Sequence, residues 1–349
     1  MKQKLILFLA AVGMLFSCTT DYEILASAES IILTADSSSR IIGNDITFTV
    51  TNNEGLDLTE EAVIYVNGVE IENNVFNSFE IGNFEVKAVY VGVNSEPITV
   101  NFHDGSEINF AKRVLIEDYT GTWCGYCPRV AHAIDLVNQQ TDKAVVVAIH
   151  RESLNPNSPS YDPYTFDSSE LEDILNIPGY PKGLLNRMTQ WTFPEPNNIN
   201  QAIALTQGEN PKLGLAMNAS VTGNNIGIDV NVQFSKDFEG LKLVVYVMEN
   251  GLVHYQYNYT NYYGGQSVIP DFVHNHTLRH CATNLLGDTI SSAETRTGNI
   301  YSRSFNFPVP ATIENAANLE FVAFVVGADG KAINVRAAKP GDVQDFEFL

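Results

Sequence analysis

The chain has 349 residues, which is long for one typical domain, and its hydrophobic fraction of 44% is enough to build folded cores. Its formal net charge is −21 at pH 7, from 41 acidic and 20 basic residues. Because an acidic surface repels phosphate backbones, the composition argues against a nucleic-acid partner.

Residues 1–17 have the pattern of a secretory signal peptide. Lys2 and Lys4 supply positive charge, and the apolar run that follows is too short to span a bilayer as a permanent helix. The run ends in Leu15-Phe16-Ser17-Cys18, which resembles the lipobox of bacterial lipoproteins. By that resemblance Cys18 is the lipidated first residue of the mature chain, and 18–29 is a tether. An ordinary signal peptide that leaves Cys18 free is the alternative.

Residues 30–103 alternate apolar and polar side chains in several short runs, as half-buried strands do. Asn67-Gly68 is a hairpin-turn signal between two such runs. The pattern predicts a small β-sandwich that resembles bacterial immunoglobulin-like domains. No chemistry is visible in this region, so a spacer or binding role is expected.

The motif Cys124-Gly125-Tyr126-Cys127 lies between an apolar run at 114–116 and a helical pattern at 130–137. This order of strand, motif and helix is typical of a thioredoxin-type redox site. The N-terminus of a helix stabilises negative charge, so Cys124 is expected to attack as a thiolate and Cys127 to resolve the mixed disulfide. A structural disulfide is the alternative. A zinc site would need two more ligands, and none lies nearby at suitable spacing.

Further residues within 108–208 resemble the thioredoxin family. Pro181 matches the family's cis-proline, so the Tyr180–Pro181 bond is expected to be cis and its neighbouring backbone to pair with a substrate. Asp118, five residues before the tryptophan of the motif, matches the family's buried acid and is expected to shuttle a proton, with Glu117 as the fallback. The resemblance also implies a substrate-contact surface shaped by Trp123, Tyr126 and Tyr180.

Residues 211–349 alternate again, and two nearly continuous apolar runs lie at 241–248 and 319–327. This pattern predicts a second β-sandwich. The fold class expected from the whole sequence is multidomain α/β plus β. A thioredoxin-like domain would lie between an N-terminal immunoglobulin-like β-sandwich and a C-terminal β-sandwich.

Three histidines and one cysteine in the C-terminal region could hold a metal. His274, His276 and His280 would share one face of a strand, although structural histidines are the more ordinary interpretation. Cys281 is left unpaired and is expected to be buried and inert, with a link to the Cys-x-x-Cys motif as the less favoured alternative. No cofactor is expected.

Five tyrosines lie close together before Gly264-Gly265. Exposed tyrosines make good contact surfaces for glycans or peptides, but tyrosine also packs readily at strand edges. The run consists of Tyr255, Tyr257, Tyr259, Tyr262 and Tyr263.

From residue 114 to the C-terminus, and in its signal, the chain resembles lipoproteins related to the twenty-eight-kilodalton outer-membrane protein of Gram-negative bacteria. The resemblance rests on Glu117-Asp118-Tyr119-Thr120-Gly121 before the dithiol and on the His-Asn-His-x-Leu-Arg run at 274–279. It implies an outer-membrane lipoprotein of the cell envelope, with the membrane face left open.

Two functional hypotheses follow. The first is a lipid-anchored thiol–disulfide oxidoreductase whose partners are protein or peptide thiols and disulfides of the envelope. Its redox direction stays open, because Gly125-Tyr126 differs from the Gly-Pro of reducing thioredoxins. The second is a surface binding lipoprotein, an adhesin or ligand-capture protein, in which the disulfide is structural. The flanking β regions and the tyrosine run favour the second.

Overall fold

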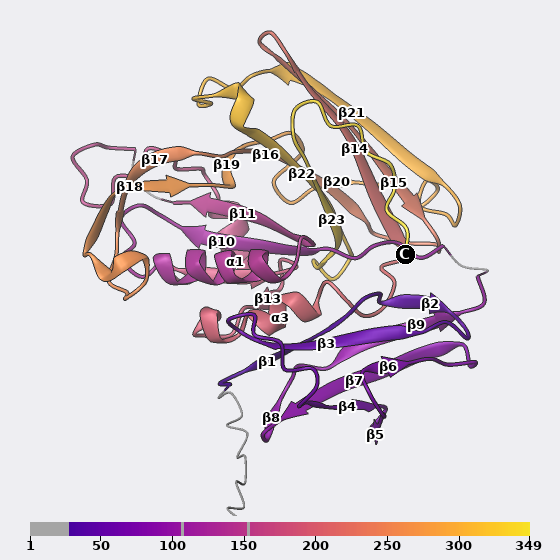
Figure 1. Cartoon of the computed structure of the whole chain (residues 1–349). Coiled ribbons are helices and arrows are strands. Elements are labelled where there is room, and N and C mark those ends of the chain that lie inside the picture. Colours follow the sequence, from indigo (N-terminus) through magenta and orange to yellow (C-terminus); the bar gives the residue numbers. More distant parts are fainter. Residues whose placement is uncertain (1–27, 106–107, 152–153) are drawn as a thin grey trace, which may run out of the picture.

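The computed structural model describes residues 28–105, 108–151 and 154–349, and it consists mostly of strands (Figure 1). Strands hold 43% of the described residues and helices 11%. None of the helices in these ranges has both the length and the apolar character needed to cross a bilayer. The predicted signal peptide and lipidation site at Cys18 lie outside the described residues.

The N-terminal strands form two sheets packed around one core. One sheet has the order β1-β3-β6, and the other has the order β2-β9-β7-β4-β5 with β8 paired to β7. Alternating residues such as Phe48, Val86 and Val100 are fully buried between them. The strands are β1 (Ile31–Ala35), β2 (Ser39–Ile41), β3 (Ile46–Asn52), β4 (Val63–Val66), β5 (Val69–Glu70), β6 (Val75–Phe76), β7 (Gly82–Tyr90), β8 (Val93–Asn94) and β9 (Ile98–His103).

The rest of the chain is organised on one nine-stranded sheet. Its order is β13-β12-β10-β11-β19-β16-β22-β23, and β20 pairs with β16. The strands are β10 (Val114–Thr120), β11 (Ala144–His150), β12 (Lys182–Leu185), β13 (Thr189–Gln190), β16 (Lys242–Glu249), β19 (Thr277–Cys281), β20 (Asp288–Thr289), β22 (Leu319–Val326) and β23 (Ala332–Ala338).

Different elements cover the two halves of one face of this sheet. Helices α1 (Pro128–Gln140) and α3 (Ile199–Ala204) pack on β10 and β11. The other half packs against a separate sheet of β14 (Leu213–Thr222), β15 (Asn225–Phe234) and β21 (Ile300–Pro308). The opposite face packs against helix α2 (Ser169–Leu175) through Leu171.

The predicted fold class, a thioredoxin-like domain between two separate β-sandwiches, is wrong, because the described residues form no separate thioredoxin-like α/β domain. Strands β10, β11 and β12 are instead one end of the nine-stranded sheet, whose other strands come from 242–338. β11 runs parallel to β19 at Ala148–Thr277, and the Ala148 N–H donates to the His276 carbonyl at 2.7 Å. An exposed strand edge leaves backbone groups without partners, and this pairing satisfies them. The central and C-terminal regions therefore share one sheet.

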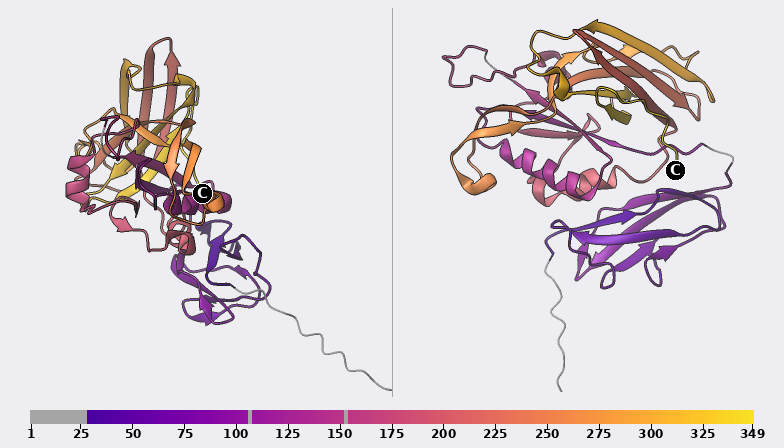
Figure 2. Two further views of the ribbon diagram at one scale, coloured as in Figure 1. Left: turned by 90° about the vertical axis from the view of Figure 1, so that its left-hand side faces the viewer. Right: turned by 45° about the horizontal axis from the view of Figure 1, so that its top comes forward.

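The N-terminal unit packs on the helical side of the larger unit, as both views in Figure 2 show. Ile32 of β1 is buried in the same core as α1 and α3, and Ala204 of α3 packs on the N-terminal core. The Ala35 N–H also donates to Gln207 Oε1 at 2.9 Å. These contacts fix the N-terminal unit against α3.

A buried polar network connects the central and C-terminal strands. Arg187, 2% exposed, lies 3.4 Å from Glu117 Oε1 of β10 and donates to the Tyr246 hydroxyl of β16 at 2.7 Å. Its guanidinium also lies 4.9 Å from the centre of the Phe324 ring of β22. Burial raises the pKa of Glu117 even though the Arg187 charge opposes this. The guanidinium is thus the main compensation for a carboxyl group in the middle of the sheet.

Replacing Arg187 by Met should destabilise the fold by about 3 kcal/mol, because it leaves Glu117 buried without a counter-charge. The loss of stability should grow as pH rises. Folding raises the pKa of Glu117, so at a pH where the unfolded chain has an ionised Glu117, the folded state is disfavoured, and more so without Arg187. Urea unfolding at pH 5 and pH 8 measures both effects. Arg296→Met is the matched control, because Arg296 and Asp237 form an exposed pair whose attraction is screened by solvent. Equal losses in the two variants would contradict a structural role for the network.

Candidate functional site

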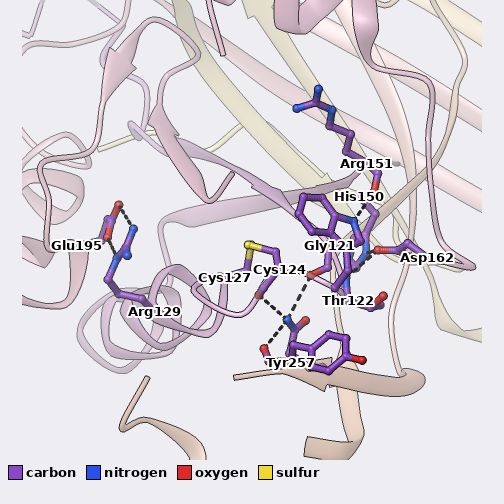
Figure 3. The surroundings of a disulfide bond; sticks show 12 residues. Gly121, Thr122, Cys124, Cys127, Arg129, His150, Arg151, Asp162, Glu195 and Tyr257 are labelled. Atoms are coloured by element: carbon purple, nitrogen blue, oxygen red, sulfur yellow. Dashed lines mark hydrogen bonds and ion pairs between the residues drawn. A yellow bond between two sulfur atoms is a disulfide. The ribbon is translucent and has the colours of Figure 1, made fainter. Parts of the chain in front are cut away.

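The candidate site is the disulfide between Cys124 and Cys127, which closes just before α1 (Figure 3). Pro128 opens the helix, and Val130, Ala133, Ile134 and Val137 are buried along one face at helical spacing, as the sequence predicted. The unpaired amides of a helix N-terminus favour negative charge. The motif therefore stands where a thiolate would be stabilised if the disulfide were reduced.

The disulfide is shielded by a hairpin from the C-terminal region. Cys124 is only 5% exposed and Cys127 only 1%. Strands β17 (Leu252–Tyr257) and β18 (Val268–His274) leave the nine-stranded sheet between β16 and β19 and extend over the motif. The Gln256 side-chain amide donates to the carbonyls of Gly121 and Cys124 at 3.2 and 2.9 Å, and the Tyr257 N–H donates to the Thr122 carbonyl at 2.9 Å. The hairpin thus binds the backbone of the motif.

The tip of the hairpin, residues 258–267, places its tyrosines against the motif and α1. The Tyr259 N–H donates to the Gly125 carbonyl at 2.6 Å, and its ring lies so close to Gly125 that a Cβ there would be 2.3 Å from Cδ2. The Tyr262 ring stacks on His132 at 4.3 Å, and the Tyr263 hydroxyl donates to Asp135 at 2.7 Å. Glycine at position 125 is therefore required for this close approach.

Asp118 lies on β10 beside the motif and is 4% exposed. Burial, reinforced by the negative charge of Glu195 and opposed by Arg129, raises the pKa of Asp118 to about 8. Its Oδ1 has no hydrogen-bond partner among the described residues. Asp118 is therefore largely protonated at neutral pH and can exchange a proton close to that pH.

A pocket of about 310 Å³ lies between α1 and β18, and Asp118 and Cys127 both line it. We refer to it as the α1–β18 pocket. His150, His274 and Gln256 also line it, together with the Tyr263 ring. The buried acid and the second cysteine thus face a common space.

The turn before the disulfide is held by a buried ion pair. Asp162 accepts from the Thr122 N–H at 2.9 Å and lies 2.8 Å from His150 Nδ1 (Figure 3). Burial alone would raise the pKa of Asp162, but His150 and the N–H groups of Thr122 and Tyr164 outweigh it and lower that pKa. Asp162 comes from the long polar loop after β11, which therefore positions the motif.

The remaining residues predicted for the dithiol site do not line the α1–β18 pocket. The Tyr180–Pro181 bond is cis, as the sequence predicted, and Pro181 directly precedes β12, which pairs with β10. Trp123 stacks on the Tyr180 ring at 6.2 Å and donates its indole N–H to the Arg151 carbonyl. Tyr126 is 55% exposed and packs edge-on against Tyr259. The structure thus gathers these predicted residues around one motif.

The histidine run is not gathered in this way. His274 and His276 both line the α1–β18 pocket, but His276 lies in the turn after β18, where its Nδ1 is 2.8 Å from Glu320. His280 packs on the Phe307 ring. The turn separates the three side chains, so they do not share one face of a strand. Within the described ranges, no group of three or more His, Cys, Asp or Glu side chains is arranged to hold a metal ion.

Cys281 is a half-buried free thiol on β19. It lies opposite Tyr246 in the neighbouring strand, and burial raises its pKa to about 11. A thiol with a raised pKa is a poor nucleophile at neutral pH, in keeping with the predicted inert role.

Four residues of the site were not predicted as such: His150, Asp162, Gln256 and Tyr259. His150 and Asp162 had a weak signal, because one ends a buried strand and the other lies in a long loop directly after it. Gln256 and Tyr259 each lie more than 130 positions after Cys124, and no local pattern connects them to the motif.

These features define a mostly β protein with a Cys-x-x-Cys disulfide at a helix N-terminus, covered by the protein's own hairpin. The model of the outer membrane protein Omp28 family matches residues 168–344, about half of the chain, and the chain belongs to this family. The predicted relation to that family is confirmed, and so is the predicted location in the outer membrane of the cell envelope.

Two solved structures match parts of this chain. HBP35 of Porphyromonas gingivalis matches 68% of this chain and 78% of its own, with a TM-score of 0.52 and 18% identity. A protein of Agrobacterium tumefaciens matches 66% of this chain and 96% of its own, with a TM-score of 0.42 and 13% identity. No curated protein matches the chain.

Removing the Tyr259 ring should expose the disulfide. Tyr259→Ala deletes the ring that covers Gly125, and Gly125→Ala displaces the same ring by steric conflict. The disulfide of both variants should therefore be reduced by dithiothreitol several-fold faster than that of the wild type. Thiol labelling after timed quenching measures the rate. Gly179→Ala is the control, because a Cβ at Gly179 meets no atom within 4 Å. Wild-type rates in both tyrosine-displacing variants would show that the hairpin tip is not the barrier.

Proposed function

We propose that this outer-membrane protein catalyses thiol–disulfide exchange in the cell envelope, anchored by a lipid on Cys18. The observation that carries the proposal is the position of the Cys124–Cys127 pair at the N-terminus of α1, beside a buried carboxyl group whose pKa is about 8. A helix N-terminus favours the thiolate, which is the attacking species in exchange.

In the reduced state, the Cys124 thiolate would attack one sulfur of a substrate disulfide and release the other as a thiolate. Cys127 would then attack the Cys124 sulfur, release the second substrate thiol and close the Cys124–Cys127 disulfide. The ionised form of Asp118 accepts the Cys127 proton in this step, since both side chains line the α1–β18 pocket. The same steps in reverse would oxidise a substrate dithiol.

The burial of both sulfurs supports a gated version of this reaction. Cys124 has only 5% of its surface exposed to a substrate sulfur while Tyr259 and Gln256 bind the hairpin to the motif backbone. Opening of residues 258–267 would precede exchange. Trp123, Tyr126 and Tyr180 do not line the α1–β18 pocket, and they would contact the substrate protein.

A second candidate function is ligand binding with a purely structural disulfide. The specific observation in its favour is the same burial, because a disulfide that is 5% and 1% exposed at its two cysteines is protected from exchange. Tyr126 and Tyr259, exposed to 55% and 61%, form an aromatic surface above the disulfide that suits contact with a partner.

The reduction potential separates the two functions. Equilibration of the protein with glutathione should give a Cys124–Cys127 potential between about −270 and −120 mV, the range of known oxidoreductases. Cys124→Ser should then abolish insulin reduction, with Cys281→Ser as a control that retains it. A potential below about −300 mV with slow exchange would identify a structural disulfide and favour the binding function.

Asp118→Asn should slow the resolving step about 10²-fold, the usual size of a general-base contribution. Asparagine keeps the shape of the side chain but cannot take up the Cys127 proton. Stopped-flow decay of a mixed disulfide with a small aromatic thiol measures the step between pH 6 and pH 9. The variant should lose the component of the pH profile centred near 8, whereas Asp135→Asn, at the exposed mouth of the pocket, should retain it. An unaltered profile in Asp118→Asn would remove Asp118 from the mechanism.

A further inference from the structure

We infer that the α1–β18 pocket binds a small organic ammonium ion with an apolar body. The inference concerns a ligand site next to the disulfide and does not require the disulfide to be exchanged. It rests on the size of the pocket, its two unpartnered buried acceptors and the sign of the charges that line it.

The pocket is large and apolar enough for a ring with a short chain. An apolar cavity of about 150 Å³ holds one benzene molecule, and this pocket has about twice that volume. Its apolar walls come from α1, β11 and β18. They include Ala131, Ile134, Val146, Ala148, Ile269 and Phe272.

Two buried acceptors in the lining have no hydrogen-bond partner among the described residues. They are Asp118 Oδ1 and His274 Nε2, on side chains 4% and 5% exposed. Burial lowers the pKa of His274 to about 3, and a hydrogen bond to the His254 backbone keeps the ring proton on the other nitrogen. The Nε2 lone pair is therefore available. Buried acceptors without donors are uncommon, and an ammonium group supplies three donors and no acceptor.

The charges point in the same direction. Asp118 lies inside the pocket, the exposed Asp135 and Asp271 also line it, and neither Lys nor Arg is among its described lining residues. The whole chain carries a formal charge of −21. The rings of Tyr263 and Phe272 add faces to which a cation is attracted. An anion would be repelled here, and a neutral ligand would leave the acidic lining unused.

Binding of a cation should be coupled to the proton on Asp118. The charges of Glu195 and of Arg129 in α1 act on this carboxyl, and Tyr263 of the hairpin tip is coupled to it. The other titratable groups that line the pocket with it are Asp135, His150, Asp271, His274 and His276. With an Asp118 pKa of about 8, the carboxyl is mostly protonated at pH 7 and mostly ionised at pH 9. Because a cation favours the ionised form, its affinity should rise about tenfold from pH 7 to pH 9.

The test is calorimetric titration of the purified, oxidised protein with 2-phenylethylamine at pH 7 and pH 9. An alkylammonium group has a pKa of about 10.4, so most of the probe stays charged across this range. We expect tighter binding at pH 9 and, at pH 7, proton release seen as a dependence of the heat on the buffer. The isosteric 2-phenylethanol and 3-phenylpropanoate should bind at least about tenfold more weakly.

Variants locate the site. Ala131→Leu fills the pocket from α1 and should abolish binding, while Gln139→Leu, exposed on the same helix and outside the pocket, should retain it. Asp118→Asn should weaken binding and remove its pH dependence, with circular dichroism reporting the fold of each variant. Absence of amine binding, equal affinity for the alcohol, or undiminished binding in a folded Ala131→Leu would overturn the inference. A protein that binds the amine but exchanges no thiols would reject only the redox function.

Discussion

The pairing of β11 with β19 is the constraint on which the rest of the molecule depends. It joins strands from 114–190 to strands from 242–338 in one sheet, so that a single core runs from Leu115 to Val335. The Arg187–Glu117–Tyr246 network lies across the same join and is buried. Buried charge of this kind is tolerated only where its partners are held in place, and the continuous sheet holds them.

The join also creates the site. The β17–β18 hairpin is the connection between β16 and β19, so the position of β19 beside β11 determines where the hairpin extends. It extends over the N-terminus of α1, where Gln256 and Tyr259 bind the backbone of the Cys-x-x-Cys motif. The cover over the disulfide and the pocket between α1 and β18 thus follow from one topological arrangement.

The site combines a reactive position with poor access. The helix N-terminus and the nearby carboxyl group are suited to thiol chemistry, while the hairpin leaves the two cysteines almost without exposed surface. A covered disulfide is protected from adventitious thiols, and opening of the cover would make exchange conditional on a partner. The acidic pocket beside it offers one place at which a small cation could act on the same region.

Local order along the chain determined the parts of the protein that depend on near neighbours. The alternation at Ile46, Phe48 and Val50 placed β3, and the helical spacing from Val130 to Val137 placed α1. The motif spacing predicted the Cys124–Cys127 pair, and the Tyr180–Pro181 bond is cis as expected. Only the tertiary structure decided that β10, β11 and β12 belong to a larger sheet. A strand edge can pair with any backbone that covers it, and side-chain periodicity does not indicate which backbone that is. The tertiary structure likewise decided that the tyrosine run covers the disulfide, since that contact joins residues more than 130 positions apart through backbone hydrogen bonds and a glycine without a side chain.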